Sequence, residues 1–199
     1  MVVDTDPNMQ EYVNTVVKDD ILYVSINSRG KKNLNFKKLN VNIEAPKLSS
    51  AKISSGSQLN TMNTINSNEF KAEVTSGANL NADLNIKNNV DVNISSGSSA
   101  KIDVKANSFE LQGSSGSMST VVGSADKVSI DLSSAAGCNA QNLVANQVNA
   151  QASSGAVIKI HANESLTATS SSGSSIRYKG NPTKNSVKES SGGSIKSIN

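Results

Sequence analysis

The sequence is dominated by an internal repeat with a period close to twenty residues. A box of three small residues, usually Ser-Ser-Gly, occurs eight times, at residues 54–56, 75–77, 95–97, 114–116, 133–135, 153–155, 171–173 and 190–192. Successive boxes lie 21, 20, 19, 19, 20, 18 and 19 residues apart. A unit this short cannot bury a core alone, so neighbouring units must stack on one another. The repeat therefore predicts a solenoid.

Apolar and polar residues alternate on both sides of each box, which is typical of half-buried strands. Val90, Val92 and Ile94 alternate before the third box, and the same parity resumes after it at Ala100 and Ile102. The abundant Ser and Asn residues are poor helix formers, which argues against a helical bundle. We expect an all-β fold, a right-handed parallel β-helix with about 19–20 residues per coil. Each coil should contain two or three short strands and two corners, one at the box and a second that is formed by polar residues.

The middle residue of every box is serine, and its position predicts a structural column. If the chain stays extended through the box, this residue points inward, and stacked coils place its hydroxyls about 4.8 Å apart, within reach of hydrogen bonds along the stack. The third position of the box is Gly in seven of the eight repeats, which fits a tight corner or a positive φ. Ala135 departs from this rule. The predicted column comprises Ser55, Ser76, Ser96, Ser115, Ser134, Ser154, Ser172 and Ser191.

The first fifty residues lack the box and have another pattern. Asp6-Pro7 predicts a short helical turn toward Tyr12, and residues 13–17 and 21–26 flank Asp19-Asp20 as a hairpin. We therefore predict an N-terminal cap over residues 1–50, continuous with the solenoid, and β-helix coils over residues 51–199.

Charge and composition exclude several classes of function. Nineteen basic and 16 acidic residues give a net charge of +3, and aromatic residues make up only 3%, which argues against nucleic-acid binding. The single cysteine excludes an intrachain disulfide. No apolar run approaches the roughly 18 residues of a membrane span, and no signal-peptide pattern opens the printed sequence. No motif indicates a cofactor, and the sequence does not give the oligomeric state.

Two pairs of carboxylates support an alternative in which the chain is a carbohydrate-active enzyme. Alignment of the repeats places Asp83 beside Asp103 in one outward column, and Asp91 beside Glu110 in another. The two members of each pair are expected to lie about 5 Å apart. Glycosidases and lyases use closely placed carboxylates for acid–base chemistry or for a metal. The same residues also fit a solvated face neutralised by lysines, and an exposed aromatic row to stack sugar rings is missing.

The remaining reactive side chains have no partners that would build a catalytic or metal site. His161 is the only histidine and is predicted to face outward, so no triad or multi-histidine metal site forms around it. Cys138 is predicted to face inward, where a free thiol packs as a small hydrophobe. The sequence predicts no catalytic residue and no metal ligand.

Basic residues are the candidates for a ligand surface, with a solvated loop as the alternative. The run at residues 28–38 holds five cations and no acid, a pattern that suits an anionic glycan or phosphate surface. A second stripe shares one outward column, interrupted by Thr120 and Asn139. The predicted candidates are Arg29, Lys31, Lys32, Lys37 and Lys38 in the run, and Lys101, Lys159, Arg177 and Lys196 in the stripe.

The boxes and their flanks resemble a bacterial envelope family, the auto-transporter adhesin head GIN domain family of Bacteroidetes. Residues 8–13 and 17–24 are similar to its N-terminal half, and residues 177–182 to its penultimate coil. No Gly-Ile-Asn tripeptide occurs here, which departs from the family pattern. The resemblance implies a right-handed parallel β-helix, export to the periplasm or cell surface and a role in surface interaction, and it transfers no site residues.

We therefore predict a non-enzymatic, exported or cell-surface β-solenoid that acts in adhesion or envelope interaction. Its expected partner is a glycan or a host or cell-surface protein, and not a nucleic acid. The alternatives are a carbohydrate-active lyase or hydrolase and a purely structural scaffold module.

Overall fold

The computed structural model describes residues 1–31 and 33–198, of which strands form the bulk. Strands account for 65% of the described residues and helix for 3%. The chain divides into two compact units, Met1–Pro46 and Lys47–Asn199. The predicted all-β class is confirmed, while the predicted continuity of cap and solenoid stays a prediction.

The unit Met1–Pro46 consists of two antiparallel strand pairs and one short helix. Strand β1 (Val2–Thr5) pairs with β4 (Leu39–Asn42), and β2 (Val13–Lys18) pairs with β3 (Ile21–Ile26). The 3-10 helix η1 (Pro7–Tyr12) has its proline in the first turn, where the missing N–H costs nothing. The predicted helical turn and the predicted hairpin are both confirmed.

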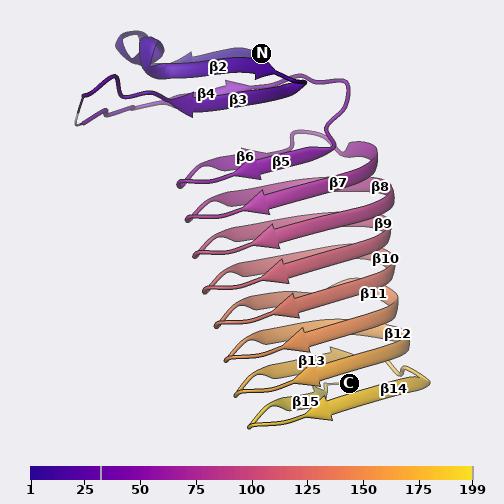
Figure 1. The fold of residues 1–199 in the computed structure, drawn as a ribbon. Helices are drawn as coiled ribbons and strands as arrows, with labels where there is room; N and C mark the ends of the chain where they lie inside the picture. The colour runs from indigo at the N-terminus through magenta and orange to yellow at the C-terminus, as the bar shows by residue number, and fades with distance from the viewer. Residues whose placement is uncertain (32, 199) are drawn as a thin grey trace. The chain divides into compact units, whose positions relative to one another are not determined.

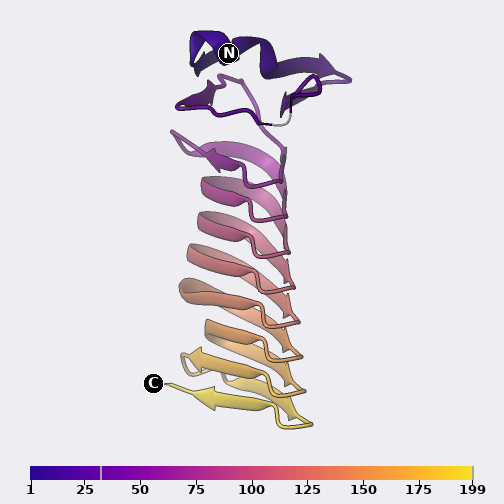
Figure 2. The ribbon, with the colours of Figure 1, turned by 90° about the vertical axis from the view of Figure 1, so that its left-hand side faces the viewer.

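The unit Lys47–Asn199 is a right-handed parallel β-solenoid of about eight turns, as predicted (Figures 1 and 2). Successive coils pair in parallel, so each coil satisfies the backbone groups of the next. Its strands are β5 (Ser50–Ile53), β6 (Gln58–Asn60), β7 (Ile65–Val74), β8 (Asn79–Ile94), β9 (Ser99–Gly113), β10 (Met118–Leu132), β11 (Gly137–Ala152), β12 (Val157–Ser170), β13 (Ser175–Lys179), β14 (Lys184–Glu189) and β15 (Ser194–Ser197).

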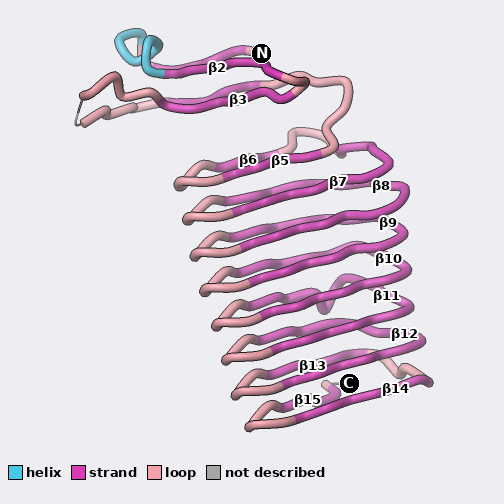
Figure 3. Tube along the Cα trace, viewed as in Figure 1, coloured by secondary structure: helices cyan, strands magenta, loops and turns pink. Residues whose placement is uncertain are grey.

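A central coil is a single long strand rather than the two or three short strands that the sequence predicts. Strands β8 to β12 each contain 14 to 16 residues and bend at the polar corner, so their two halves lie on opposite sides of the coil (Figure 3). Neighbouring coils bend at the same place, so their pairing continues around the corner with register shifts such as that between Asn85 and Asn89. We call the half that follows each box the post-turn face and the half that precedes the next box the pre-turn face.

The boxes form tight turns, and this overturns the predicted inward serine column. Ser96 and Gly97 both have positive φ, 56° and 69°, and the amide of Ser98 donates to the carbonyl of Ser95. Two central residues with positive φ define a type I′ turn. The middle serines are therefore exposed at the corner instead of pointing inward, at Ser55, Ser76, Ser96, Ser115, Ser134, Ser154, Ser172 and Ser191.

Backbone groups connect these turns from coil to coil, and a hydroxyl pair adds to them at the first box position, where Thr75 Oγ1 and Ser95 Oγ lie 3.2 Å apart. The amide of Gly77 donates to the carbonyl of Ser96 at 3.0 Å, and the amide of Gly97 donates to that of Ser115 at the same distance. The predicted glycine with positive φ is confirmed, and Ala135 adopts the same conformation with φ of 60°. The turns thus stack in register mainly through the backbone, and the middle serines remain exposed to solvent.

The core fills the space between the two faces with small and medium apolar side chains. Phe70, Val90, Phe109 and Val128 lie in one inward column on successive coils, each at most 2% exposed. Burying a side chain of this size contributes about 1.5–3 kcal/mol, so a column repeated on every coil stabilises the stack. The solenoid therefore presents only its outward columns, its corners and its ends to a ligand.

Candidate ligand-binding site

The predicted basic run at residues 28–38 is largely neutralised by acidic residues from other parts of its unit. Arg29 Nη1 lies 3.1 Å from Glu11 Oε2, and Lys38 forms an ion pair with Asp4. Because β1 pairs with β4, it brings Asp4 beside residues that follow the run. The run is therefore not the acid-free surface that its sequence predicts.

Of the other cations of the run, Lys31 contacts an aromatic ring through its charged group, whereas, among the described residues, Lys37 is held only through its backbone. Lys31 Nζ lies 4.8 Å from the centre of the Tyr12 ring, and its hydrogen bond to Tyr12 raises the pKa of Lys31. The backbone amide of Lys37 donates to Asp6 Oδ2 at 2.7 Å, while Lys32 lies outside the described residues. The unit Met1–Pro46 carries six basic and six acidic residues, so it has no net charge.

The second predicted stripe lies on the post-turn face, and the strand register aligns its members as expected. Lys101 pairs with Thr120 on the next coil, which pairs with Asn139, and Asn139 pairs with Lys159. Lys159 then pairs with Arg177, and Arg177 with Lys196, on β12, β13 and β15. We call Lys159, Arg177 and Lys196 the basic column, since these three follow one another without interruption.

The four carboxylates of the enzyme hypothesis lie on two different faces. Asp83 and Asp103 are register neighbours on the post-turn face, whereas Asp91 and Glu110 are neighbours on the pre-turn face. Asp91 Oδ2 lies 3.4 Å from Lys71 Nζ, so a lysine already neutralises one of them. Within residues 1–31 and 33–198, no three His, Cys, Asp or Glu side chains group closely enough to hold a metal ion.

The two remaining reactive side chains lie far from a catalytic arrangement. Cys138 is 3% exposed in the core, where burial raises the pKa of its thiol to about 11 and keeps the thiol protonated. His161 faces outward as predicted, next to Lys179 of the following coil. A cation beside the imidazole does not provide the acceptor that a general base requires.

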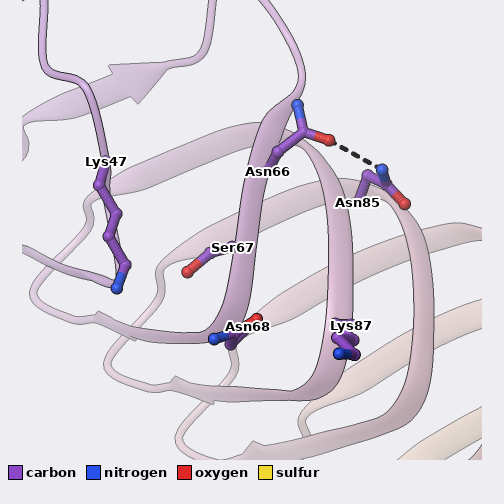
Figure 4. A pocket seen from close by; sticks show the side chains of 6 residues that line it. All are labelled: Lys47, Asn66, Ser67, Asn68, Asn85 and Lys87. Carbon is purple, nitrogen blue, oxygen red and sulfur yellow. Dashed lines mark hydrogen bonds between the residues drawn. The ribbon is translucent and has the colours of Figure 1, made fainter.

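A depression that sequence analysis did not predict lies at the polar corner of the first coils (Figure 4). Its volume is about 580 Å³, and its lining holds two lysines, three asparagines and one serine: Lys47, Asn66, Ser67, Asn68, Asn85 and Lys87. Asn85 Nδ2 donates to Asn66 Oδ1 at 2.8 Å, whereas the buried Ser67 Oγ has no hydrogen-bond partner among the described residues. The repeat pattern gave no signal for this site, because the corner residues vary in number and type.

A second depression of about 510 Å³ lies on the pre-turn face and has mixed charge. Lys71, Glu73 and Asp131 line it together with amide and hydroxyl side chains such as Asn93 and Gln112. Both depressions are shallow and polar, so the described surfaces suit a hydrophilic ligand that lies along the solenoid.

The fold and these surfaces define a parallel β-solenoid protein with polar outward columns, and the comparisons assign it to a family. Residues 1–182 match the family described as "Putative auto-transporter adhesin, head GIN domain", so the chain belongs to that family, as the resemblance indicated. No functionally curated protein matches the chain at a significant level. No helix in the described part of the chain has the length and apolar character needed to cross a membrane.

Solved structures from Bacteroidetes share the fold. A "putative adhesin" from Parabacteroides merdae is 21% identical, with a TM-score of 0.90 over 99% of this chain and 82% of that one. A second from Bacteroides fragilis is 25% identical, with a TM-score of 0.69 over 96% and 78% of the two chains. A "putative lipid binding protein" from Parabacteroides distasonis is 17% identical, with a TM-score of 0.89 over 99% and 83%.

Proposed function

We propose that this chain is a non-enzymatic adhesion module, exported from the bacterial cell or displayed at its surface, that binds a glycan or a surface protein through its outward columns. The observation that carries the proposal is the regular stacking of polar side chains along the post-turn face. Asn81, Lys101, Thr120, Asn139 and Lys159 occupy one column on five successive coils.

This arrangement suits binding because the solenoid fixes the polar groups before the ligand arrives. Each member of the column lies on a strand that is paired on both sides, so little backbone conformational entropy remains to be lost on binding. Repeat proteins commonly use such extended surfaces for recognition. The ion pair of Asp91 with Lys71 supports binding over hydrolysis, because it neutralises one of the candidate catalytic carboxylates.

The family supports the same role and the same location. Adhesins act outside the cytoplasm, and the related solved structures described as putative adhesins come from bacteria with an outer envelope. Binding of a lipid tail inside the solenoid is disfavoured, because the interior is filled: Leu111, Ile130, Ala150 and Ala168 are at most 1% exposed.

The test is a binding measurement with the purified chain. A glycan array and a whole-cell assay with labelled protein are each titrated to saturation, and the same protein after thermal unfolding serves as the control. Saturable binding that the unfolded control lacks is expected in at least one assay. Absence of saturable binding in both would overturn the adhesion proposal.

A further inference from the structure

The positive charge of the chain is concentrated in its last coils. Residues 157–199 contain six basic and two acidic residues, whereas residues 47–156 contain seven basic and eight acidic ones. The unit Met1–Pro46 is neutral, as described above. The net charge of +3 therefore arises entirely from the C-terminal coils, and a long-range attraction for anions is directed there.

Within these coils the basic column places cations directly above one another. Lys159 pairs with Arg177, and Arg177 pairs with Lys196, at the spacing of about 4.8 Å between paired strands. Lys179 extends the positive area, because it faces outward on the same face and pairs with His161. Three rungs give a row of positive charge about 10 Å long, parallel to the solenoid axis.

No ion pair joins this row to an acid among the described residues, although the carboxylate of Glu189 on β14 reaches the last strand of the row and accepts from the backbone amide of Ile195. On the post-turn halves of these three strands, the other outward residues before the corner are Val157, His161, Ser175, Lys179 and Ser194. The ion pairs among residues 1–31 and 33–198 all lie elsewhere, and two of them join consecutive coils: Lys52 with Glu73 at 3.0 Å and Lys71 with Asp91 at 3.4 Å.

Stacked like charges are unfavourable between paired strands, so the basic column is a local conflict with stability. Conflicts of this kind in an otherwise consistent fold concentrate at functional sites. An anion that bridges two rungs would relieve the repulsion. The guanidinium of Arg177 adds a planar fork that can bind a carboxylate or sulfate through two hydrogen bonds.

We propose that the basic column binds a linear acidic polysaccharide whose chain follows the solenoid axis. This proposal rests on the adhesion function proposed above and specifies its ligand. Ser175, Ser194 and Asn139 flank the column with hydroxyl and amide groups that match sugar hydroxyls. The described outward positions of this face carry no aromatic ring, so a ligand here is held through its charges and hydroxyl groups and not by stacking of bases or sugar rings.

The test compares the full chain with two variants of equal net charge. In the first, Lys159→Gln, Arg177→Gln and Lys196→Gln remove the basic column. In the control, Lys18→Gln, Lys105→Gln and Lys127→Gln remove three exposed cations that lie outside the last coils and outside both depressions. Affinity is measured by calorimetry for polygalacturonate, and for methyl-esterified polygalacturonate as the uncharged polymer with the same backbone.

We expect the wild type to bind polygalacturonate in a salt-dependent manner and to bind the methyl ester much more weakly. The basic-column variant should lose about ten- to a hundredfold in affinity, while the control should lose less than threefold. Equal losses in the two variants would show that only net charge matters and would overturn the proposal. An unchanged affinity in the basic-column variant would overturn it as well.

Two further outcomes separate this proposal from the adhesion function. If the chain binds cells or neutral glycans but not polygalacturonate, the acidic polysaccharide is wrong and adhesion stands. If the basic column is needed for binding vesicles of phosphatidylserine and phosphatidylcholine but polygalacturonate does not bind, the ligand is a membrane and the proposal fails. Circular dichroism of both variants checks that each is folded.

Discussion

Substitution of Gly123 by alanine should destabilise the solenoid far more than the same change at Gly116 in the turn that begins the same coil. Gly123 has a φ of +110°, and a Cβ built there would lie 2.0 Å from the carbonyl oxygen of Val104 on the preceding coil. Ordinary contact begins near 3.4 Å, so the two coils would have to separate by about 1.4 Å at this point. Gly116 has a φ of +70° and no atom within 4 Å of its Cβ position.

The expected magnitudes follow from these two geometries. Alanine at Gly116 adds only the cost of a left-handed conformation, about 1–2 kcal/mol, and Ala135 already occupies the equivalent position. Alanine at Gly123 adds about 1–3 kcal/mol of conformational strain. The forced separation also weakens backbone hydrogen bonds beside Val104, each worth about 1 kcal/mol, which brings the total to roughly 3–5 kcal/mol.

Equilibrium unfolding in urea, followed by circular dichroism, measures both variants against the wild type. The two sites lie in one coil, so both substitutions act on the same cooperative unit of the solenoid. The Gly123→Ala variant should unfold at a clearly lower urea concentration than the Gly116→Ala variant. Equal midpoints, or the reverse order, would refute the reasoning from φ and close approach.

Three other substitutions test the turn, the thiol and the core. Ser115→Gly should raise the free energy of unfolding by up to about 1 kcal/mol in urea titrations, because it relieves a left-handed serine with φ of 54°, and a lower midpoint would contradict this. The pKa of Cys138 rises from 9.0 to about 11 in the fold, so the unfolded chain loses its thiol proton first and the free energy of unfolding falls as the pH rises between those values. The free energy of unfolding of Cys138→Ala should fall less steeply over a pH series in that range, and equal slopes for variant and wild type would count against this prediction. Phe109→Ala should lower the free energy of unfolding by about 3–5 kcal/mol in thermal or urea unfolding. Met62→Ala replaces a side chain that is 92% exposed and should change this free energy by less than about 0.5 kcal/mol. Similar losses in the two variants would contradict the placement of Phe109 in the core.

The coil register could be predicted from the sequence because each position can be counted from the nearest box. Lys101, Lys159, Arg177 and Lys196 each follow the box glycine by four residues, and the strand pairing aligns them as that count predicts. Counting works on the post-turn face because no irregular corner intervenes. A count carried across the polar corner fails at the register shifts, but beyond the corner the count runs back from the next box, and it aligns Asp91 with Glu110 as predicted.

The orientation of the middle serine could not be predicted by the same counting. A turn that places Ser96 and Gly97 at its centre leaves Ile94 and Ser98 both buried, which is the parity that an extended chain would also give. Apolar parity alone therefore does not distinguish the two conformations. The positive φ of the serine decides the matter, and a serine gives no sequence signal for it.

The basic run at residues 28–38 shows a second limit, which concerns charge. Its neutralising partners Glu11 and Asp4 are distant in sequence and reach the run only through the packing of Met1–Pro46. Inspection of residues 28–38 alone finds the five cations but neither of the two acidic partners. The basic column differs because its neighbours within one column are fixed by the repeat, so the unbroken series of three cations could be predicted directly.

Repulsion within the basic column leads to a last prediction, that the triple variant Lys159→Gln, Arg177→Gln, Lys196→Gln is at least as stable as the wild type. Like charges on paired strands oppose folding, and glutamine retains much of the length of each side chain. Screening lengths shrink from about 30 Å at 0.01 M salt to about 3 Å at 1 M, so any gain should be largest at low salt and vanish at high salt. Urea midpoints at the two salt concentrations measure this, and a less stable variant at low salt would mean that the three cations support the fold instead of opposing it.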